Sequence, residues 1–253
     1  MYFDTHAHYD DSDFDEDRDE LLSSLQEQGV SLVVNAASSM PSSRMAQKIA
    51  SQYPFIYFSA GVHPHDSKDM TDGDFDELRM MSKDPKCVAV GEIGLDYHYD
   101  LSPRDVQKMR FYQQMELARE LKKPVIIHER EACADVLDTV TQFKDIPGVY
   151  HCFSGSWETA KVILDQGWYL SFTGIITFKN VRRALEVIEK MPADRLMIET
   201  DSPYLSPVPM RGTRNNSSNL KYTAQKAAEV RGISHEELAK LTLENGKRFF
   251  GIK

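Results

Sequence analysis

Short apolar segments recur along the chain and alternate with longer segments of helical periodicity. Eight mostly apolar segments are strand candidates: 2–8, 31–37, 56–62, 86–93, 124–128, 148–153, 168–175 and 195–200. Between and after them, apolar residues recur three or four positions apart, as on one face of a helix: 15–29, 42–52, 74–83, 103–122, 131–143, 156–166, 180–190, 219–231 and 235–249. Strand segments that are apolar throughout predict burial on both faces, as in a parallel sheet.

Eight strands that alternate with helices in 253 residues predict the α/β class and a single (β/α)8 TIM barrel. We therefore expect one domain spanning residues 1–253, with an active site at the C-terminal rim of the strands. A doubly wound open sheet is the alternative, but the chain has no Gly-x-Gly-x-x-Gly turn to support it. The Pro-, Ser- and Asn-rich segment 202–218 is expected to be a loop over that rim.

The net charge of −9 is concentrated in one segment, residues 10–20, which carries eight acids and one arginine, or −7. The rest of the chain therefore carries −2, so the acidic average does not exclude a basic groove elsewhere. We interpret the acidic segment as a solvated loop leading into a helix, where the helix dipole favours acidic side chains.

Three cysteines, Cys87, Cys133 and Cys152, form no Cys-x-x-Cys pair and cannot all be paired. This favours a reduced, cytoplasmic setting. No apolar run approaches the roughly 20 residues of a membrane helix. No charged region followed by an apolar region stands at the N-terminus, so we expect neither a signal peptide nor a membrane partner.

Polar residues that can bind metals stand at the ends of the apolar segments. The set consists of His6, His8, Glu92, His128, His151 and Asp201. Alone, each has an ordinary interpretation, such as a hydrogen-bonded core histidine or a turn-capping aspartate. Together, at the end of a barrel where active sites are built, they favour a metal cluster, because unpartnered burial would cost several kcal/mol for each group.

Six ligands exceed the needs of one tetrahedral ion, so we expect two divalent ions. Imidazole with carboxylate suits Mg, Mn or Zn, whose identity the pattern leaves open. One ion would take His6, His8, Glu92 and Asp201, and the other Glu92, His128 and His151, with Glu92 as the bridge. Asp4 is a candidate partner behind these ligands.

Several motifs, in order, resemble the TatD family of metal-dependent deoxyribonucleases, which belongs to the amidohydrolase-like TIM barrels. They are FDTHAH, AGVHPH, VGEIGLDYHYD, PVIIHERE, HCFSG, GIITFKN and ETDSPYLSPVP, which together run from residue 3 to about residue 214. The resemblance implies divalent-metal-dependent hydrolysis of DNA phosphodiester bonds, with the six ligands named above.

Two details refine this resemblance. Many related amidohydrolases carry a carbamylated lysine on the fourth strand, whereas Glu92 stands here and favours the nuclease branch. Family members often have Arg-Asn-Glu-Pro in the last loop, where this chain has Asn216 and Ser217 in place of Glu-Pro. That departure affects the expected substrate contacts of the loop and leaves the expected ligand set complete.

In the mechanism that the resemblance implies, two ions activate a water for attack on phosphorus. Glu92 and Asp201 are the expected catalytic residues, and Asp201 is placed to accept the proton of the water or to hold it in line. Expected substrate-binding residues are His63, Arg130, Arg211 and Arg214. For each arginine the alternative is a surface salt bridge, and for His65 a structural role.

The leading hypothesis is therefore a monomeric DNase, an exonuclease acting on single strands or ends. The second is a small-molecule amidohydrolase or phosphoesterase that uses the same binuclear centre. The third is a binding protein that kept the barrel, against which the complete ligand set argues. A thiol nucleophile at Cys152 is disfavoured, because a histidine that binds metal cannot also act as its base.

Overall fold

The computed structural model describes residues 1–253. Its strands are β1 (Tyr2–Ala7), β2 (Val30–Asn35), β3 (Ile56–Ala60), β4 (Cys87–Asp96), β5 (Val125–Arg130), β6 (Gly148–Tyr150), β7 (Tyr169–Phe172) and β8 (Leu196–Ile198). They follow one another in the sheet in chain order, and the pairings are parallel. Every predicted strand segment overlaps one strand, and the predicted (β/α)8 fold class is confirmed.

The helices follow the strands in the expected alternation. They are α1 (Arg18–Ser24), α2 (Met40–Gln52), α3 (Asp72–Met81), α4 (Arg104–Leu121), α5 (Cys133–Val140), α6 (Trp157–Leu164), α7 (Arg183–Lys190), α8 (Leu220–Arg231) and α9 (His235–Phe250). Short 3-10 turns are η1 (Ser12–Phe14), η2 (Pro64–Asp69), η3 (Gly174–Thr177), η4 (Ala193–Arg195) and η5 (Ser217–Asn219). None of the helices combines the length and the apolar character that a membrane crossing requires.

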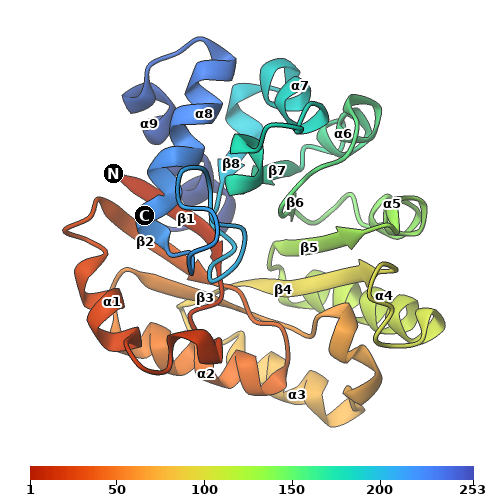
Figure 1. Cartoon of the computed structure of the whole chain (residues 1–253). Coiled ribbons are helices and arrows are strands. Elements are labelled where there is room, and N and C mark those ends of the chain that lie inside the picture. Colours follow the sequence, from red (N-terminus) through yellow and green to blue (C-terminus); the bar gives the residue numbers. More distant parts are fainter. The chain divides into compact units, whose positions relative to one another are not determined.

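The chain forms two compact units, the first of which comprises residues 1–35 and 152–253. In this unit β1 pairs with β2, β7 pairs with β8, and Ala7 forms a bridge with Ser202 just beyond β8. Helices α8 and α9 pack against β1 and β8 (Figure 1). The packing is close, because a Cβ at Gly246 of α9 would lie 2.6 Å from the ring of Phe3.

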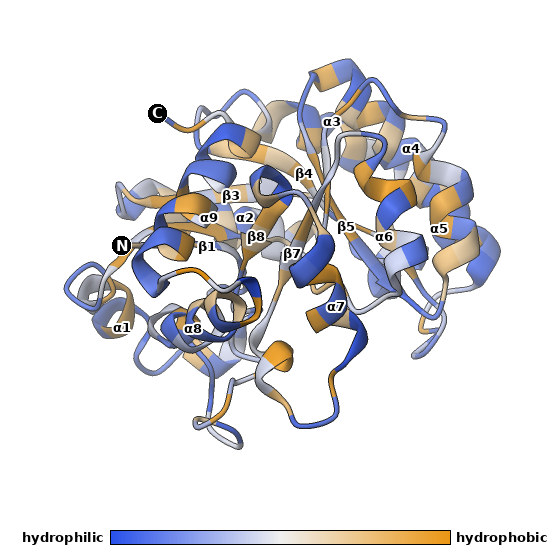
Figure 2. Cartoon of the chain, turned by 90° about the horizontal axis from the view of Figure 1, so that it is seen from above, coloured by the Kyte–Doolittle hydropathy of each residue, from blue (hydrophilic) through white to orange (hydrophobic).

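The second unit comprises residues 36–151 and contains β3, β4, β5 and β6, paired in that order. All ten residues of β4 are buried, as expected for a strand that is covered on both faces. Helix α2 packs against β3, and α4 packs against β4. Figure 2 shows hydrophobic colours along much of β4, whereas α4 alternates between hydrophobic and hydrophilic residues.

The structure differs from the sequence predictions mainly at element ends. The predicted helix 15–29 is shorter, since α1 ends at Ser24 and turns lead to Gly29, whose φ of 88° favours glycine. The acidic segment 10–20 is more than a solvated loop. Within it, Asp11 accepts a hydrogen bond of 2.6 Å from the Tyr204 hydroxyl, and Asp17 pairs with Arg214.

Candidate metal centre

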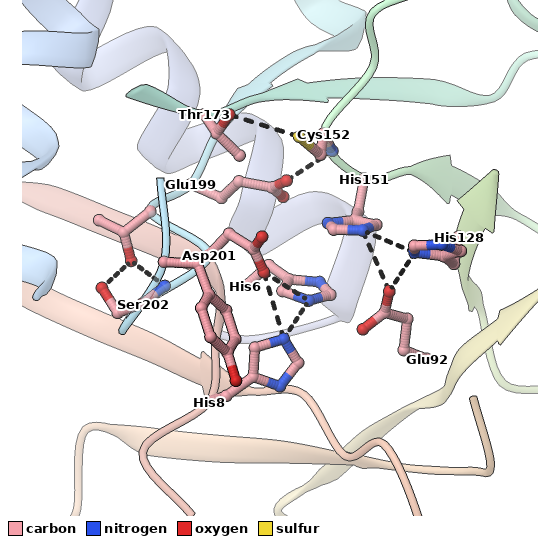
Figure 3. Close-up of polar contacts among 12 residues, drawn as sticks. His6, His8, Glu92, His128, His151, Cys152, Thr173, Glu199, Asp201 and Ser202 are labelled. Carbon is pink, nitrogen blue, oxygen red and sulfur yellow. Dashed lines mark hydrogen bonds and ion pairs between the residues drawn. The ribbon is translucent and has the colours of Figure 1, made fainter. Parts of the chain in front are cut away.

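The first set of predicted ligands, His6, His8 and Asp201, comes together at the ends of β1 and β8. The backbone fixes this: the Asp201 N–H donates to the His6 carbonyl at 2.9 Å, and the His8 N–H donates to the Ser202 carbonyl at 2.7 Å. Because His6 and His8 are two positions apart along an extended chain, their rings point to the same side. Figure 3 shows both imidazoles and the Asp201 carboxylate directed toward one another.

The ligand atoms of this first set converge. His6 Nε2 lies 3.1 Å from His8 Nε2, His8 Nε2 lies 3.2 Å from Asp201 Oδ1, and His6 Nε2 lies 3.6 Å from the same oxygen. Donors bound at about 2.1 Å to one divalent ion lie about 3.0 to 3.4 Å apart in octahedral or tetrahedral geometry. The three separations are therefore close to the edges of a coordination polyhedron.

Asp4 lies behind this first set and is completely buried. Its carboxylate accepts hydrogen bonds from the Thr200 N–H at 2.9 Å, from the Thr200 hydroxyl, and from the Ser217 hydroxyl at 2.6 Å. Burial raises the pKa of Asp4 to about 6, although these hydrogen bonds oppose the shift. Asp4 also accepts the His6 backbone N–H at 3.4 Å, and it holds the chain between β8 and Asp201 against β1.

The second set, Glu92, His128 and His151, comes together in the other unit. Glu92 Oε1 lies 2.8 Å from His128 Nδ1 and 3.0 Å from His151 Nε2, and the two nitrogens are 3.4 Å apart (Figure 3). Glu92 is buried, and its own N–H donates to the Ala37 carbonyl at 2.7 Å. This set also has two imidazole nitrogens and one carboxylate oxygen at separations that fit a shared ion.

Two glycines let β4 approach β5 at this point. At Gly94, whose φ is 148°, a Cβ would lie 1.9 Å from the His128 carbonyl oxygen, and at Gly91 it would lie 2.8 Å from Ile126 Cβ. Only glycine fits both the space and the backbone conformation at Gly94. These glycines flank Glu92 and bring its carboxylate within reach of His128 on the neighbouring strand.

Asp96 is a site residue that sequence reasoning missed. Its Oδ2 lies 3.1 Å from His128 Nε2 and 3.0 Å from His65 Nε2, and its Oδ1 accepts the N–H groups of His98 and Tyr99. If His128 donates its Nε2 proton to Asp96, the Nδ1 lone pair faces Glu92 and His151, which is the usual arrangement behind a metal-binding histidine. The spacing of four residues from Glu92 along one strand is the signal that could have identified it.

Electrostatics support this pairing. Burial would raise the pKa of Asp96, but hydrogen bonds from His128, the Tyr99 N–H and His65 outweigh it and hold that pKa well below its usual range. Burial would lower the pKa of His128, but hydrogen bonds to Asp96 and Glu92 outweigh it and raise that pKa. Asp96 is therefore an anion at neutral pH.

His63 is buried beside the second set, but its ring proton is on the nitrogen that a metal ligand would need to leave free. Its Nδ1 accepts the His65 N–H at 3.2 Å, so the proton of the neutral ring is on Nε2, which lies 3.6 Å from Glu92 Oε1. Burial, followed by the charge of neighbouring His128, holds the pKa of His63 well below its usual range. His63 is therefore a neutral hydrogen-bond donor at physiological pH.

Glu199 is a second residue that sequence reasoning missed. It is buried directly after β8, and its Oε1 accepts the Cys152 N–H at 2.6 Å. The Cys152 sulfur faces the Thr173 hydroxyl at 3.4 Å (Figure 3). The position of Glu199 after an apolar strand, two residues before Asp201, could have marked it as a site residue.

The three predicted substrate arginines differ in their surroundings. Arg130 is exposed at the end of β5 and stacks on Tyr99 at 4.7 Å, and Arg211 is exposed and stacks on Phe178 at 4.0 Å. Neither forms an ion pair. Arg214 instead pairs with both oxygens of Asp17 and donates to the Asp13 carbonyl, which fits the alternative of a surface salt bridge.

The donor chemistry of both sets fits a divalent metal. Each set offers two imidazole nitrogens and one carboxylate oxygen, the ligands that Zn, Mn and Fe sites use. In the second unit, ligand atoms of His63, Glu92 and His128 all lie within 4.8 Å of one another. The tautomer of His63 favours His151 as the third member, and the Asp96 carboxylate behind His128 completes the arrangement.

The family model described as TatD related DNase matches residues 3–251. A relative from Bacillus subtilis, the uncharacterized metal-dependent hydrolase YabD, is 42% identical over 254 residues, covering 100% of both chains. A relative from Citrobacter koseri, named 3'-5' ssDNA/RNA exonuclease TatD, is 35% identical over 259 residues, covering 99% of both.

Among solved structures, the TatD homologue YJJV from Escherichia coli is 26% identical and superposes with a TM-score of 0.93, covering 100% of this chain and 98% of the other. A TatD family hydrolase from Entamoeba histolytica, 23% identical with a TM-score of 0.91, covers 100% of this chain and 99% of the other and has the same fold. Fold, donor chemistry and family model agree. The chain belongs to the TatD family and is a metal-dependent hydrolase.

Proposed function

We propose that this hydrolase cleaves DNA phosphodiester bonds as an exonuclease on single strands or ends. The observation that carries the proposal is the pair of convergent donor sets, each with two imidazole nitrogens and one carboxylate oxygen 2.8–3.6 Å apart. The exonuclease name of the Citrobacter koseri relative supports a nucleic-acid substrate. We further propose that residues 1–253 act as one catalytic domain and one monomer.

The proposed ligands of one divalent ion are His6, His8 and Asp201. Those of the second ion are His128 and His151, and Glu92 is proposed to be shared between them. Once bound, such ions lower the pKa of a water and neutralise charge on the phosphoryl oxygens. This division predicts that each chain binds two ions, Mg, Mn or Zn. It also predicts that removing one set of ligands weakens the binding of one ion more than that of the other.

The residues of the chain would then orient the substrate and move the proton. Asp201 is half-buried at the end of β8, so its carboxylate can accept the proton of the attacking water. His63 carries its proton on Nε2 and stays neutral, so it can donate a hydrogen bond to a phosphate or leaving-group oxygen. Arg130 and Arg211, whose guanidinium groups form no ion pair, can each bind a phosphate of the substrate.

Arg214 is the weakest of the proposed substrate contacts, because Asp17 already neutralises its charge. A phosphate would have to compete with a two-oxygen ion pair for this guanidinium. The matched comparison is Arg211, three residues earlier in the same loop. We expect Arg211→Gln to weaken substrate binding more than Arg214→Gln does.

The experiment uses a 3'-protected and a 3'-free end-labelled single strand, with Mg, Mn or Zn added to metal-stripped protein. We expect metal-dependent release of nucleotides from the free end. Glu92→Gln and Asp201→Asn should each reduce the rate by about 10² to 10⁴, and exposed Asp100→Asn should leave it unchanged. Turnover of amides or lactones in a parallel panel, with no nucleotide release under any metal, would reject the proposal.

A further inference from the structure

We propose that two loops of the first unit form a track for a single polynucleotide strand leading to Asp201. The track consists of Tyr204, Val208 and Arg211 from segment 202–218, together with Phe178 and Lys179, which follow η3. This inference rests on the proposed function, because it names the surface that would bind the substrate of the same site. It concerns residues outside the two donor sets.

The two loops are joined into one surface. The Val208 N–H donates to the Thr177 hydroxyl at 2.8 Å. A Cβ at Gly174 would lie 2.5 Å from the Leu205 carbonyl oxygen, so the two backbones touch with no side chain between them. The Arg211 guanidinium then covers the ring of Phe178 at 4.0 Å. The two loop backbones, and the Arg211 and Phe178 side chains, therefore have fixed neighbours.

The positive charges of the track have no carboxylate partner. Arg211 and Lys179 are exposed, and neither forms an ion pair, although the chain has a net charge of −9. Arg214 shows the contrast, because its charge is neutralised by Asp17. Two unpaired cations on joined loops of an acidic protein are complementary to a phosphate backbone.

The apolar part of the track reaches the first donor set. Tyr204 is 51% exposed, its ring centroid lies 6.3 Å from that of His8, and its N–H donates to the Asp201 carbonyl at 2.9 Å. Val208 is 45% exposed further along the same loop. An exposed aromatic ring such as Tyr204 can stack on an unpaired base, whereas the bases of duplex DNA are already paired and stacked. The geometry therefore favours a single strand over a duplex.

The test compares Lys179→Gln/Arg211→Gln with the control Lys48→Gln/Lys240→Gln, which removes two exposed lysines outside the track and without ion pairs. Binding of a fluorescent, phosphorothioate-linked dT20, which resists cleavage, is followed by anisotropy at several salt concentrations. In parallel, kcat/KM of the Mn-loaded enzyme is measured for dT20 and for bis(4-nitrophenyl) phosphate. The thermal midpoint of each variant checks its folding.

We expect the track variant to bind dT20 at least tenfold more weakly at low salt. The slope of log affinity against log salt should fall by about 1.4, or about 0.7 for each phosphate that the variant no longer neutralises. The ratio of kcat/KM for dT20 to that for the small substrate should fall equally, and the control should match wild type.

The inference would be overturned if the track variant bound dT20 with the same affinity and salt dependence as the control. It would also be overturned if the wild-type protein did not bind dT20. Failure of the proposed function looks different. In that case wild type cleaves neither phosphodiester, and the binding measurement still decides whether the track exists.

Discussion

Replacing Asp96 with asparagine should weaken one metal ion selectively. Asp96 Oδ2 faces both His128 Nε2 at 3.1 Å and His65 Nε2 at 3.0 Å, and its Oδ1 accepts two backbone N–H groups. Asparagine can keep the backbone contacts through its single oxygen, but its NH₂ group cannot accept a proton from either ring. The neutral His128 ring would then favour a proton on Nδ1, the atom that faces Glu92.

The expected magnitude follows from the loss of a carboxylate behind a metal-binding histidine, which costs about 10- to 100-fold in affinity, or about 1.4 to 2.8 kcal/mol. The ion at Glu92, His128 and His151 should be affected, and the ion at His6, His8 and Asp201 much less. Competition titrations with a chromogenic zinc chelator measure both affinities.

A matched control is Asp100→Asn. Asp100 lies four residues after Asp96, is exposed and pairs with Arg104. Its positive φ is a conformation that asparagine tolerates. The control should bind both ions as wild type does. An Asp96→Asn protein that binds both ions with wild-type affinity would refute the role given to this carboxylate.

Further predictions concern stability and pH. Gly94→Ala should lower the free energy of unfolding by about 3 kcal/mol or more, because its Cβ would meet the His128 carbonyl. Gly167→Ala, which has positive φ but open space around it, should lower it by about 1 kcal/mol. Urea denaturation measures both changes. Ser217→Ala should lower the free energy of unfolding by about 1 to 3 kcal/mol, because it removes a hydrogen-bond donor to buried Asp4. A loss as small as that of an exposed Ser-to-Ala change would contradict this. The pKa of His128 is raised in the folded, metal-free protein, so the protonated ring stabilises the fold. This stabilisation should be complete below pH 6.5 and should be lost as the pH rises through the folded pKa. NMR titration of the ring measures that pKa.

The first donor set could be predicted from the sequence because its geometry is local to strand ends. His6 and His8 share a face by the two-residue period of a strand, and Asp201 follows the strand that neighbours β1 in a barrel. The apolar run before each residue marked the strand and therefore its end. This is why the fold class and the convergence within each set followed from pattern alone.

Asp96 was missed because the apolar pattern ended the fourth strand at residue 93, so its four-residue spacing from Glu92 was not read as lying on one strand. The structure continues β4 to Asp96, since Gly94 lets the strand remain against β5 where any side chain would collide with His128. The ion pair of Arg214 with Asp17 joins residues almost two hundred positions apart and has no sequence signal. The same holds for Ser217, whose hydroxyl donates a hydrogen bond to Asp4.

The most direct test of the central claim, that two donor sets bind two divalent ions, is an anomalous difference map from a crystal of the Mn-loaded protein. We expect two peaks, each about 2.2 Å from its ligands: one at His6, His8 and Asp201, the other at His128 and His151. A fully loaded crystal with no peak at either set, or with manganese bound only elsewhere, would show that these residues do not form the metal centre.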